Sequence, residues 1–303
     1  MVDALTMPLP SPTPLETILL TSDDARVFVA PERGGMVTRF FVGERPVLYL
    51  DEATLLDQTK NVRGGNPVLF PSPGKLEGDR WSRDGRAGAM GQHGFARTTP
   101  WDVVGQASDE VTLRLASSDA TRAVFPWDFV ATYRYALRGH VLRIEQHFEN
   151  TGRDPIPFGA GFHPYFELAQ AKKANTDRPR LATNATRAWD NATKAMISLA
   201  GPIDLTGPEV DLHLIDHRGG AGNAATLDLG DGHQVVVSAS DAFTRWVVWT
   251  LEGRDFVCLE PWTAPGNALN TGEGLLVAQP GQIVELWTEI ALLPLKAFSL
   301  LGI

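Results

Sequence analysis

Short runs rich in Val, Phe, Trp and Thr recur along the whole chain, and Gly and Pro residues separate them. β-Branched and aromatic residues favour strands, whereas Gly and Pro interrupt them. The runs are RVFVAP, VTRFFV, VTLRLA, FVATYRYAL, VLRIEQHF, QVVVSAS, TRWVVWTL, FVCLEPW and IVELWTEIALL. Helical periodicity is weak, with one short helix predicted at DEATLLDQ, and strands do not alternate with helices as a parallel sheet requires. With 29 Gly and 21 Pro, the pattern predicts an all-β fold, a large antiparallel sandwich or barrel.

The clearest β-hairpin is predicted within residues 128–150, where two strands flank a turn at residues 138–140. Alternate residues of its second strand point to opposite faces of the sheet. One face carries Leu142, Ile144, Gln146 and Phe148. The other face carries Arg143, Glu145 and His147. We therefore expect one buried face and one face in contact with solvent.

The domain organisation follows from the same pattern. Antiparallel folds of this kind run past about 250 residues as one domain, so we predict a single β-sandwich domain over residues 21–303. The start of the chain, MVDALTMPLPSPTPLET, carries four prolines and predicts a flexible N-terminal arm over residues 1–20. The polar stretch 169–194 interrupts the strand pattern. We expect it to be a surface excursion at the rim of a binding cleft.

Composition narrows the classes of partner. The chain has 303 residues and a net charge of -9, which argues against nucleic acid and against an anionic membrane surface, and favours a small-molecule partner. The single cysteine, Cys258, cannot form an internal disulfide, so a reducing, cytoplasmic location is expected. The first residues lack the features of a signal peptide, and no apolar run approaches the ~18 residues of a spanning helix. The oligomeric state is left open.

His163 is the first candidate for a catalytic residue. It stands in FGAGFHPYF, where Pro164 fixes the backbone after it and Phe162, Tyr165 and Phe166 surround it. Such a frame would hold the imidazole in one orientation, and the unperturbed pKa of ~6.5 suits histidine to proton transfer near neutrality. The segment therefore predicts a general acid. A core histidine that donates to a backbone carbonyl fits the segment equally well.

Glu260 is the second candidate. It follows the apolar residues Val257 and Leu259 near the end of DFVCLEPW, and Pro261 comes directly after it. An acidic residue at the end of a buried strand either caps a turn or points into a pocket. In a pocket, burial would raise the pKa of the carboxyl and make it a better base.

Glycine-rich segments supply three further candidates. GQHGFAR contains His93 and Arg97, and RGGNP contains Arg63. Glycine lets the backbone approach a ligand closely, and the planar guanidinium suits hydroxyls, carboxylates or phosphates. Ordinary surface ion pairs are the alternative for both arginines.

The remaining histidines and two tryptophans receive simpler interpretations. The histidines predicted to be solvated, in turns or on polar strand faces, are His140, His147, His213, His217 and His233. Trp249 and Trp262 would either stack on a sugar face or belong to the core. The sequence contains no P-loop, no GxGxxG after a strand, no HExxH, no GxSxG and no cysteine pair, which argues against nucleotide binding and serine hydrolysis.

Taken in order, five segments give the chain a family resemblance. They are RGGNPVLFPSPGKL, QHGFAR, FHPYF, CLEPWTAPGNAL and QPGQIVELWTEI. Their order and spacing, over roughly residues 25 to 293, resemble the aldose 1-epimerase (mutarotase) family, and especially the branch with hexose-6-phosphate mutarotases and LacX-like proteins. The resemblance implies a single large antiparallel β-sandwich of the galactose mutarotase type. It also implies interconversion of the α and β anomers of an aldose without a metal or organic cofactor.

The resemblance assigns roles to the candidates. It implies that Glu260 is the base, that His163 is the acid, and that His93 and Arg63 position the sugar. RGGNPVLFPSPGKL departs from the RGGIPVCFPQFG of phosphate-specific members, so we expect a free hexose such as glucose or galactose. A hexose 6-phosphate, with Arg97 as an anion contact, is the alternative. Two other hypotheses remain: a sugar-binding protein without catalysis, and a metal site of two histidines and a carboxylate.

Overall fold

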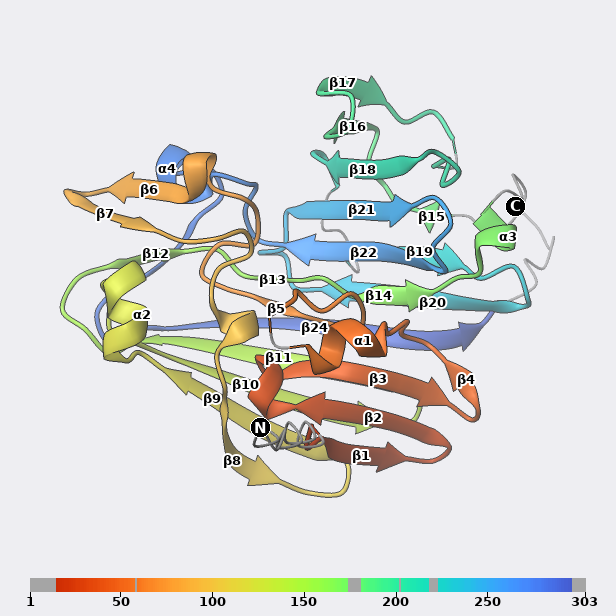
Figure 1. Cartoon of the computed structure of the whole chain (residues 1–303), viewed down its shortest axis with the longest axis horizontal. Helices are drawn as coiled ribbons and strands as arrows, with labels where there is room; N and C mark the ends of the chain where they lie inside the picture. Colours follow the sequence, from red (N-terminus) through yellow and green to blue (C-terminus); the bar gives the residue numbers. More distant parts are fainter. Residues whose placement is uncertain (1–14, 58, 174–180, 202, 218–222, 296–303) are drawn as a thin grey trace, which may run out of the picture.

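Antiparallel β-sheets make up most of the structure, a computed structural model that describes residues 15–57, 59–173, 181–201, 203–217 and 223–295. Every named pair of strands in these ranges is antiparallel, and the helices are few and short (Figure 1). The predicted all-β fold and the antiparallel sandwich are therefore confirmed.

The first large sheet has eight strands. Their spatial order is β15 (Leu181–Ala182), β19 (Asn223–Asp228), β20 (His233–Ala239), β24 (Ile283–Pro294), β11 (Val141–Asn150), β10 (Phe129–Arg138), β9 (Glu110–Ala116) and β8 (Asp102–Gln106). The predicted hairpin is β10 and β11, with Phe129 opposite Asn150 and Arg138 opposite Val141. Its predicted core residues are all buried: Leu142, Ile144, Gln146 and Phe148.

The second large sheet carries the residues that matter most for function. Its spatial order is β17 (Ala195–Ser198), β16 (Arg187–Asp190), β18 (Glu209–Leu214), β21 (Arg245–Leu251), β22 (Phe256–Trp262), β13 (Gly161–Phe162) and β5 (Val68–Leu69). A further strand, β14 (Tyr165–Glu167), also pairs with β22. The strands from β17 to β22 lie one beside the next in Figure 1.

Smaller elements complete the described chain. A four-stranded sheet contains β1 (Ile18–Ser22), β2 (Ala25–Ala30), β3 (Met36–Val42) and β4 (Arg45–Pro46). Two strand pairs are β6 (Arg80–Arg83) with β7 (Arg86–Ala89), and β12 (Ile156–Phe158) with β23 (Leu276–Ala278). The α-helices are α1 (Glu52–Leu56), α2 (Asp119–Val124), α3 (Gln170–Lys173) and α4 (Ala268–Thr271). The short 3-10 helices are η1 (Pro31–Arg33), η2 (Glu77–Asp79) and η3 (Ala96–Thr98).

The predicted short helix is α1. The side chain of Asp51 accepts a hydrogen bond from the Thr54 N–H at 3.2 Å, which satisfies one of the free donors at the start of a helix. None of the helices in the described ranges has the length and apolar character needed to cross a membrane.

Aromatic side chains join the two large sheets. Tyr133 of β10 meets Phe162 of β13 with ring centroids 5.9 Å apart, and Phe70, next to β5, stacks on Phe148 of β11 at 5.1 Å. Burial of such rings supplies much of the hydrophobic stabilisation of a sandwich. The main buried cluster draws on residues from Leu20 to Leu292. The single domain over residues 21–303 stays a prediction.

Two predicted boundaries are modified by the structure. Residues 1–14 of the predicted arm lie outside the described residues, but Ile18–Leu20 belong to β1 and Leu20 is fully buried. The predicted excursion 169–194 is not only a loop, because α3, β15 and β16 fall within it. Residues 174–180 of it lie outside the described ranges.

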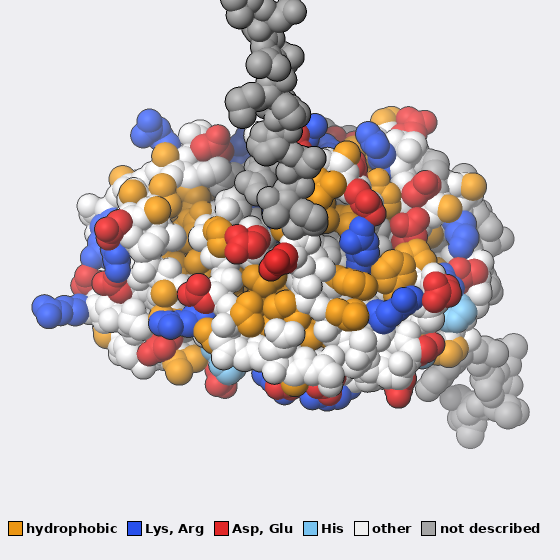
Figure 2. Space-filling model, turned by 60° about the horizontal axis from the view of Figure 1, so that its bottom comes forward, with side chains coloured by type: hydrophobic (Ala, Val, Ile, Leu, Met, Phe, Trp, Pro, Cys, Tyr) orange, Lys and Arg blue, Asp and Glu red, His pale blue; other side chains and the backbone are white. Residues whose placement is uncertain are grey.

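The surface carries charges of both signs. On the face shown in Figure 2, Lys and Arg side chains are interspersed with Asp and Glu. Mixed charges of this kind are typical of a solvated surface. Three of the histidines predicted to be solvated do reach solvent, each beside a carboxylate: His140, His147 and His233.

His217 contradicts the prediction that it is solvated. Its ring is 3% exposed, lies 4.7 Å from the ring of Trp246, and its Nδ1 is 2.7 Å from the Thr183 hydroxyl. The ring of Trp246 on the neighbouring strand β21 packs against it, and this contact explains the error. Burial lowers the pKa of His217 to about 4.

A pH dependence of stability follows from His217. The unfolded chain binds a proton at this residue below about pH 6.5, whereas the folded chain resists it until about pH 4, so stability is lost as the pH falls through that window. Between pH 7 and pH 5 we expect the wild type to lose about 2 kcal/mol more free energy of unfolding than His217→Gln. Urea unfolding at both pH values measures this difference, with His147→Gln as the exposed-histidine control. Equal losses in wild type and His217→Gln would contradict the assignment.

Candidate active site

One face of the second large sheet forms the floor of a cleft. In β18 the residues alternate strictly: Val210, Leu212 and Leu214 are buried in the core. The other face of β18 carries the cleft residues Glu209, Asp211 and His213. Because side chains on a strand alternate between faces, the core side chains of β18 fix the direction of its polar ones.

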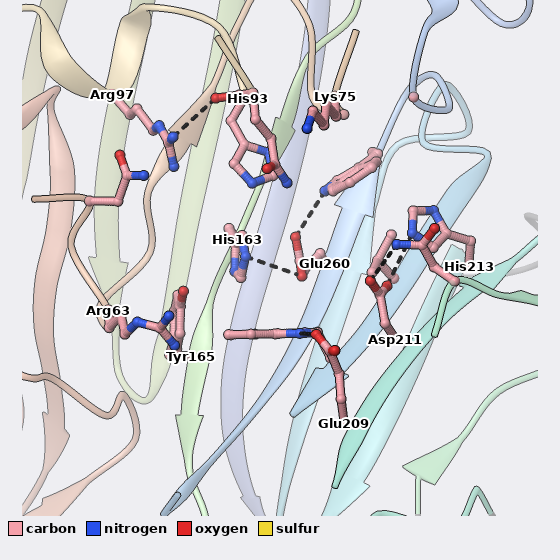
Figure 3. Close-up of a pocket in the computed structure, with 18 of the residues that line it drawn as sticks. Arg63, Lys75, His93, Arg97, His163, Tyr165, Glu209, Asp211, His213 and Glu260 are labelled. Carbon is pink, nitrogen blue, oxygen red and sulfur yellow. Dashed lines mark hydrogen bonds and ion pairs between the residues drawn. The ribbon is translucent and has the colours of Figure 1, made fainter. Parts of the chain in front are cut away.

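Strand register brings the two proposed catalytic residues together. His213 of β18 is opposite Val247 of β21, which is opposite Glu260 of β22. The chain passes from β13 to β14 through His163, whose N–H donates to the Pro67 carbonyl at 3.1 Å. His163 Nε2 lies 3.4 Å from Glu260 Oε1, as Figure 3 shows. Residues 97 positions apart in sequence thus form one pair.

The pair lies in a cleft of about 570 Å³. The cleft is lined by Asn61, Val62, Arg63, Gly74, Lys75, Gln92, His93, Arg97, His163, Tyr165, Asn191, Lys194, Glu209, Asp211, His213, Val247, Trp249, Glu260, Trp262 and Gly266. All five candidate site residues and both candidate tryptophans are in this set. The structure therefore brings together every residue that the sequence singled out for the site.

Aromatic rings hold His163 in place. Its ring is stacked on Tyr165, with centroids 4.7 Å apart and planes 8° apart, and it meets Trp249 edge-on at 5.8 Å. Burial lowers the pKa of His163 well below its usual value, and the nearby His93 and Arg97 add to this effect. The imidazole therefore gives up a proton easily.

Glu260 is buried and faces the cleft rather than capping a turn. It is 1% exposed, and its Oε2 accepts a hydrogen bond from Trp262 Nε1 at 3.2 Å. Burial raises the pKa of Glu260 well above its usual value, and the negative charge of Asp211 raises it further. A carboxylate with a raised pKa holds a proton more strongly, which suits a base.

The backbone around His93 is unusual. His93 has φ +71° and is followed by Gly94 at φ +74°, where an added Cβ would lie 2.1 Å from the Phe70 carbonyl oxygen. This close approach explains the glycine in QHGFAR. His93 Nδ1 bonds to the Pro73 carbonyl, so Nδ1 carries the hydrogen and Nε2 is left as an acceptor. Burial, with a contribution from Arg97, lowers the pKa of His93 to about 4.

Four cations line the cleft. Arg63 is exposed and lies over the Trp249 ring at 5.8 Å, and Arg97 donates to the Gln92 carbonyl at 3.0 Å. Within the described residues, neither arginine is within ion-pair distance of a carboxylate, so the alternative of surface ion pairs is not supported. Sequence reasoning missed the other two cations, Lys75 and Lys194. They belong to glycine-rich and polar loops with no distinctive pattern of their own.

A polar wall on β18 was also missed. His213 was predicted to be solvated, but it lines the cleft, with its Nε2 3.2 Å from Asp211 Oδ1 and its ring 5.5 Å from Trp262. Asn191 Nδ2 donates to the other Asp211 oxygen at 2.7 Å. Burial raises the pKa of Asp211, but these hydrogen bonds outweigh it and the net shift is downward. The alternation in EVDLHL indicates that Asp211 and His213 share one face of a strand, but it does not indicate that this face lines a cleft.

One group of side chains could hold a metal ion. Within the described ranges, the donor atoms of His163, Cys258 and Glu260 lie within 4.8 Å of one another. The hypothetical set of two histidines and a carboxylate does not form such a cluster there. Burial raises the pKa of the Cys258 thiol, which opposes the thiolate that a metal would require.

The fold and the cleft define a class. The large antiparallel sandwich is the fold of galactose mutarotase-like proteins. Residues 16–291 match the family described as Aldose 1-epimerase, and the chain belongs to this family.

Comparison with solved structures agrees with this family assignment. The Slr1438 protein from Synechocystis sp. PCC 6803 is 36% identical, with 96% of this chain and 99% of that chain covered and a TM-score of 0.88. A galactose mutarotase-like protein from Lactobacillus casei ATCC 334 shares the fold, with 20% identity, 92% and 100% coverage and a TM-score of 0.74.

A curated relative matches a shorter region. A protein of Salmonella typhimurium named "Putative glucose-6-phosphate 1-epimerase" is 32% identical over 132 residues. The alignment covers 42% of this chain and 40% of that protein, so the chain matches less than half of that relative's length.

Proposed function

We propose that this protein interconverts the α and β anomers of a hexose by general acid–base catalysis. The observation that supports it best is the buried pair of His163 and Glu260, 3.4 Å apart on the floor of a cleft. The C1 hydroxyl oxygen and the ring oxygen of an aldose are bonded to the same carbon. A base and an acid that serve both oxygens must therefore lie close to one another.

The proposed chemistry needs only protons. Glu260 takes the proton of the C1 hydroxyl while His163 gives a proton to the ring oxygen. The bond from C1 to the ring oxygen breaks, and C1 becomes the carbonyl carbon of the open aldehyde. After rotation about the C1–C2 bond, the two residues exchange roles and the ring closes on the other face. At each step the pair accepts one proton from the sugar and donates one proton to it, so the total number of protons on the pair is unchanged.

The pKa directions suit these roles. The active pair holds one proton in total; the raised pKa of Glu260 favours its taking a proton, and the lowered pKa of His163 favours its giving one. These directions suit removal of the C1 hydroxyl proton by Glu260 and protonation of the ring oxygen by His163.

The other cleft residues would bind the sugar. His93 Nε2 can accept a hydrogen bond from a hydroxyl, Asp211 offers a carboxylate, and Arg63 offers donors. Trp249 and Trp262 supply apolar walls. A sugar-binding protein without catalysis would need these groups but not an acid–base pair with shifted pKa values, which favours the enzyme. The cytoplasmic location stays a prediction.

We propose a free hexose as the substrate, with a hexose 6-phosphate as the second candidate. The polar wall of Asp211, His213 and Asn191 suits neutral hydroxyl groups. The second candidate is favoured by Lys75 and Arg97, which lie on either side of His93 in Figure 3 and could bind a phosphate. The "Putative glucose-6-phosphate 1-epimerase" relative points the same way.

NMR exchange between anomers of glucose and glucose 6-phosphate, in wild type and in Arg97→Ala, separates the two candidates. For a free hexose, we expect wild type to favour glucose, and Arg97→Ala to change the ratio of the two efficiencies by less than about threefold. A preference for the phosphate that disappears in Arg97→Ala would make hexose 6-phosphate the substrate. Absence of exchange with either sugar, and with galactose, would contradict the proposed activity itself.

A further inference from the structure

The row of side chains that contains Glu260 continues beyond the cleft. In register across the second large sheet, Glu260 is followed by Val247, His213, Trp189 and Met196, on β22, β21, β18, β16 and β17. Residues directly opposite one another in antiparallel strands point to the same face. Trp189 and Met196 therefore lie on the face that carries the catalytic pair. Figure 1 shows these strands side by side.

Neighbouring residues confirm this direction for Trp189. Asn191, in the turn that follows β16, donates a hydrogen bond to Asp211 in the cleft, so the chain after Trp189 leads directly to the cleft. Ala188, one residue before Trp189, is fully buried on the opposite face. The turn from β16 to β17 carries Asn191 and Lys194, both of which line the cleft. Trp189 thus lies just beyond the rim.

Trp189 differs from the other tryptophans. It is 37% exposed and is the only one of the eight among the exposed large hydrophobic residues, and Met196 beside it is 52% exposed. No ring contact to another aromatic residue is found for Trp189 among the described residues. An indole in water beside an active-site cleft loses hydrophobic stabilisation unless something covers it.

We propose that Trp189 and Met196 form a second sugar subsite. Resting on the proposed function, this subsite takes the non-reducing unit of a disaccharide whose reducing unit occupies the cleft. The negative face of an indole attracts the slightly positive C–H groups on one face of a pyranose. Asn191 and Lys194, joined by a 2.7 Å hydrogen bond, line the cleft in the turn that follows Trp189 and can bind hydroxyls or the bridging oxygen.

The spacing suits two sugar units. Three strand intervals separate Glu260 from Trp189, or about 14 Å across the sheet. A reducing unit with C1 at Glu260 lies over Val247 and His213, and its far side then points to Trp189. Continuity with the cleft is what identifies a sugar, rather than a protein, as the occupant of this apolar surface.

The test compares one- and two-unit sugars. NMR exchange gives kcat/KM for glucose, maltose and isomaltose, and calorimetry gives their binding. In Trp189→Ala, we expect the ratio of the disaccharide efficiency to the glucose efficiency to fall roughly three- to tenfold, while glucose is unchanged. Trp189→Phe keeps an aromatic face and should restore most of the ratio. Leu293→Ala, an exposed apolar residue on the other large sheet, is the matched control and should change nothing.

Each outcome decides the proposal. A selective loss with either disaccharide supports the subsite and identifies the linkage. An unchanged ratio with both disaccharides, or equal loss with glucose, overturns it. If no sugar shows exchange, the proposed activity has failed, and the subsite is judged by calorimetry alone. Maltose binding that weakens in Trp189→Ala would then support it, and binding that is absent or unchanged would overturn it.

Discussion

Glu260→Gln is expected to lower the rate of anomer exchange by roughly 10²- to 10⁴-fold, the contribution typical of a positioned general base. The amide has nearly the same shape as the carboxyl and can still accept the hydrogen bond from Trp262 Nε1. It cannot take the proton of the C1 hydroxyl. The loss should therefore appear in kcat, with KM changed little, when exchange is followed by NMR.

Glu209→Gln provides a matched control. Glu209 lines the same cleft and also accepts a hydrogen bond from a tryptophan, Trp249 Nε1 at 3.1 Å. Among the described residues no hydrogen bond or ion pair joins Glu209 to His163, so we expect kcat to fall less than about tenfold. Rates within about tenfold of wild type in Glu260→Gln, or equal losses in both variants, would contradict the role of Glu260.

Folding stability separates a catalytic loss from a structural one. Because the pKa of Glu260 is raised in the folded protein, the buried carboxylate destabilises the fold as the pH rises above the ordinary range of a carboxyl group. The amide carries no such cost. Glu260→Gln should therefore be at least as stable as wild type at neutral pH, as measured by urea unfolding.

The strands could be predicted because each one is a short local run of β-branched and aromatic residues. The alternation in VLRIEQHF and the turn after Arg138 fix one hairpin, and both appear in the structure as predicted. The order of the strands within a sheet could not be predicted in this way, because β21 and β22 also pair with strands that are distant in the sequence. Such order depends on packing between layers, which no local pattern reports.

The site was predictable where unusual residue types met glycine or proline. His163 stands out beside Pro164, which fixes the backbone, and His93 stands out beside Gly94, which lets the backbone approach closely. Asp211 and His213 were missed because an alternating polar strand is typical of any half-exposed sheet. Only the position of β18 beside β21 turns that polar face into a wall of the cleft.

Burial was the hardest property to predict for single residues. His217 carries no sequence feature that separates it from His140, yet it lies against Trp246 while His140 reaches solvent beside Asp24. The exposure of Trp189 is the reverse case, because tryptophan is usually highly buried. Both depend on which neighbouring strand covers the residue.

His163→Asn is expected to reduce anomer exchange about as strongly as Glu260→Gln, by roughly 10²- to 10⁴-fold. Asparagine keeps a polar group beside Glu260 but cannot give a proton to the ring oxygen. NMR exchange measures the loss. His213→Asn is the matched control, because His213 lies in the same cleft but contacts Asp211 rather than Glu260, and its kcat should fall less than about tenfold.

The double variant His163→Asn with Glu260→Gln tests whether the two residues act as one unit. Proton removal from the C1 hydroxyl is of little use unless the ring oxygen receives a proton in the same event. The double variant should therefore be about as slow as the slower single variant, rather than slow by the product of the two losses. Losses that multiply would show that the two residues act independently. A His163→Asn variant with near-wild-type exchange would remove His163 from the mechanism and leave Glu260 to work with a different acid.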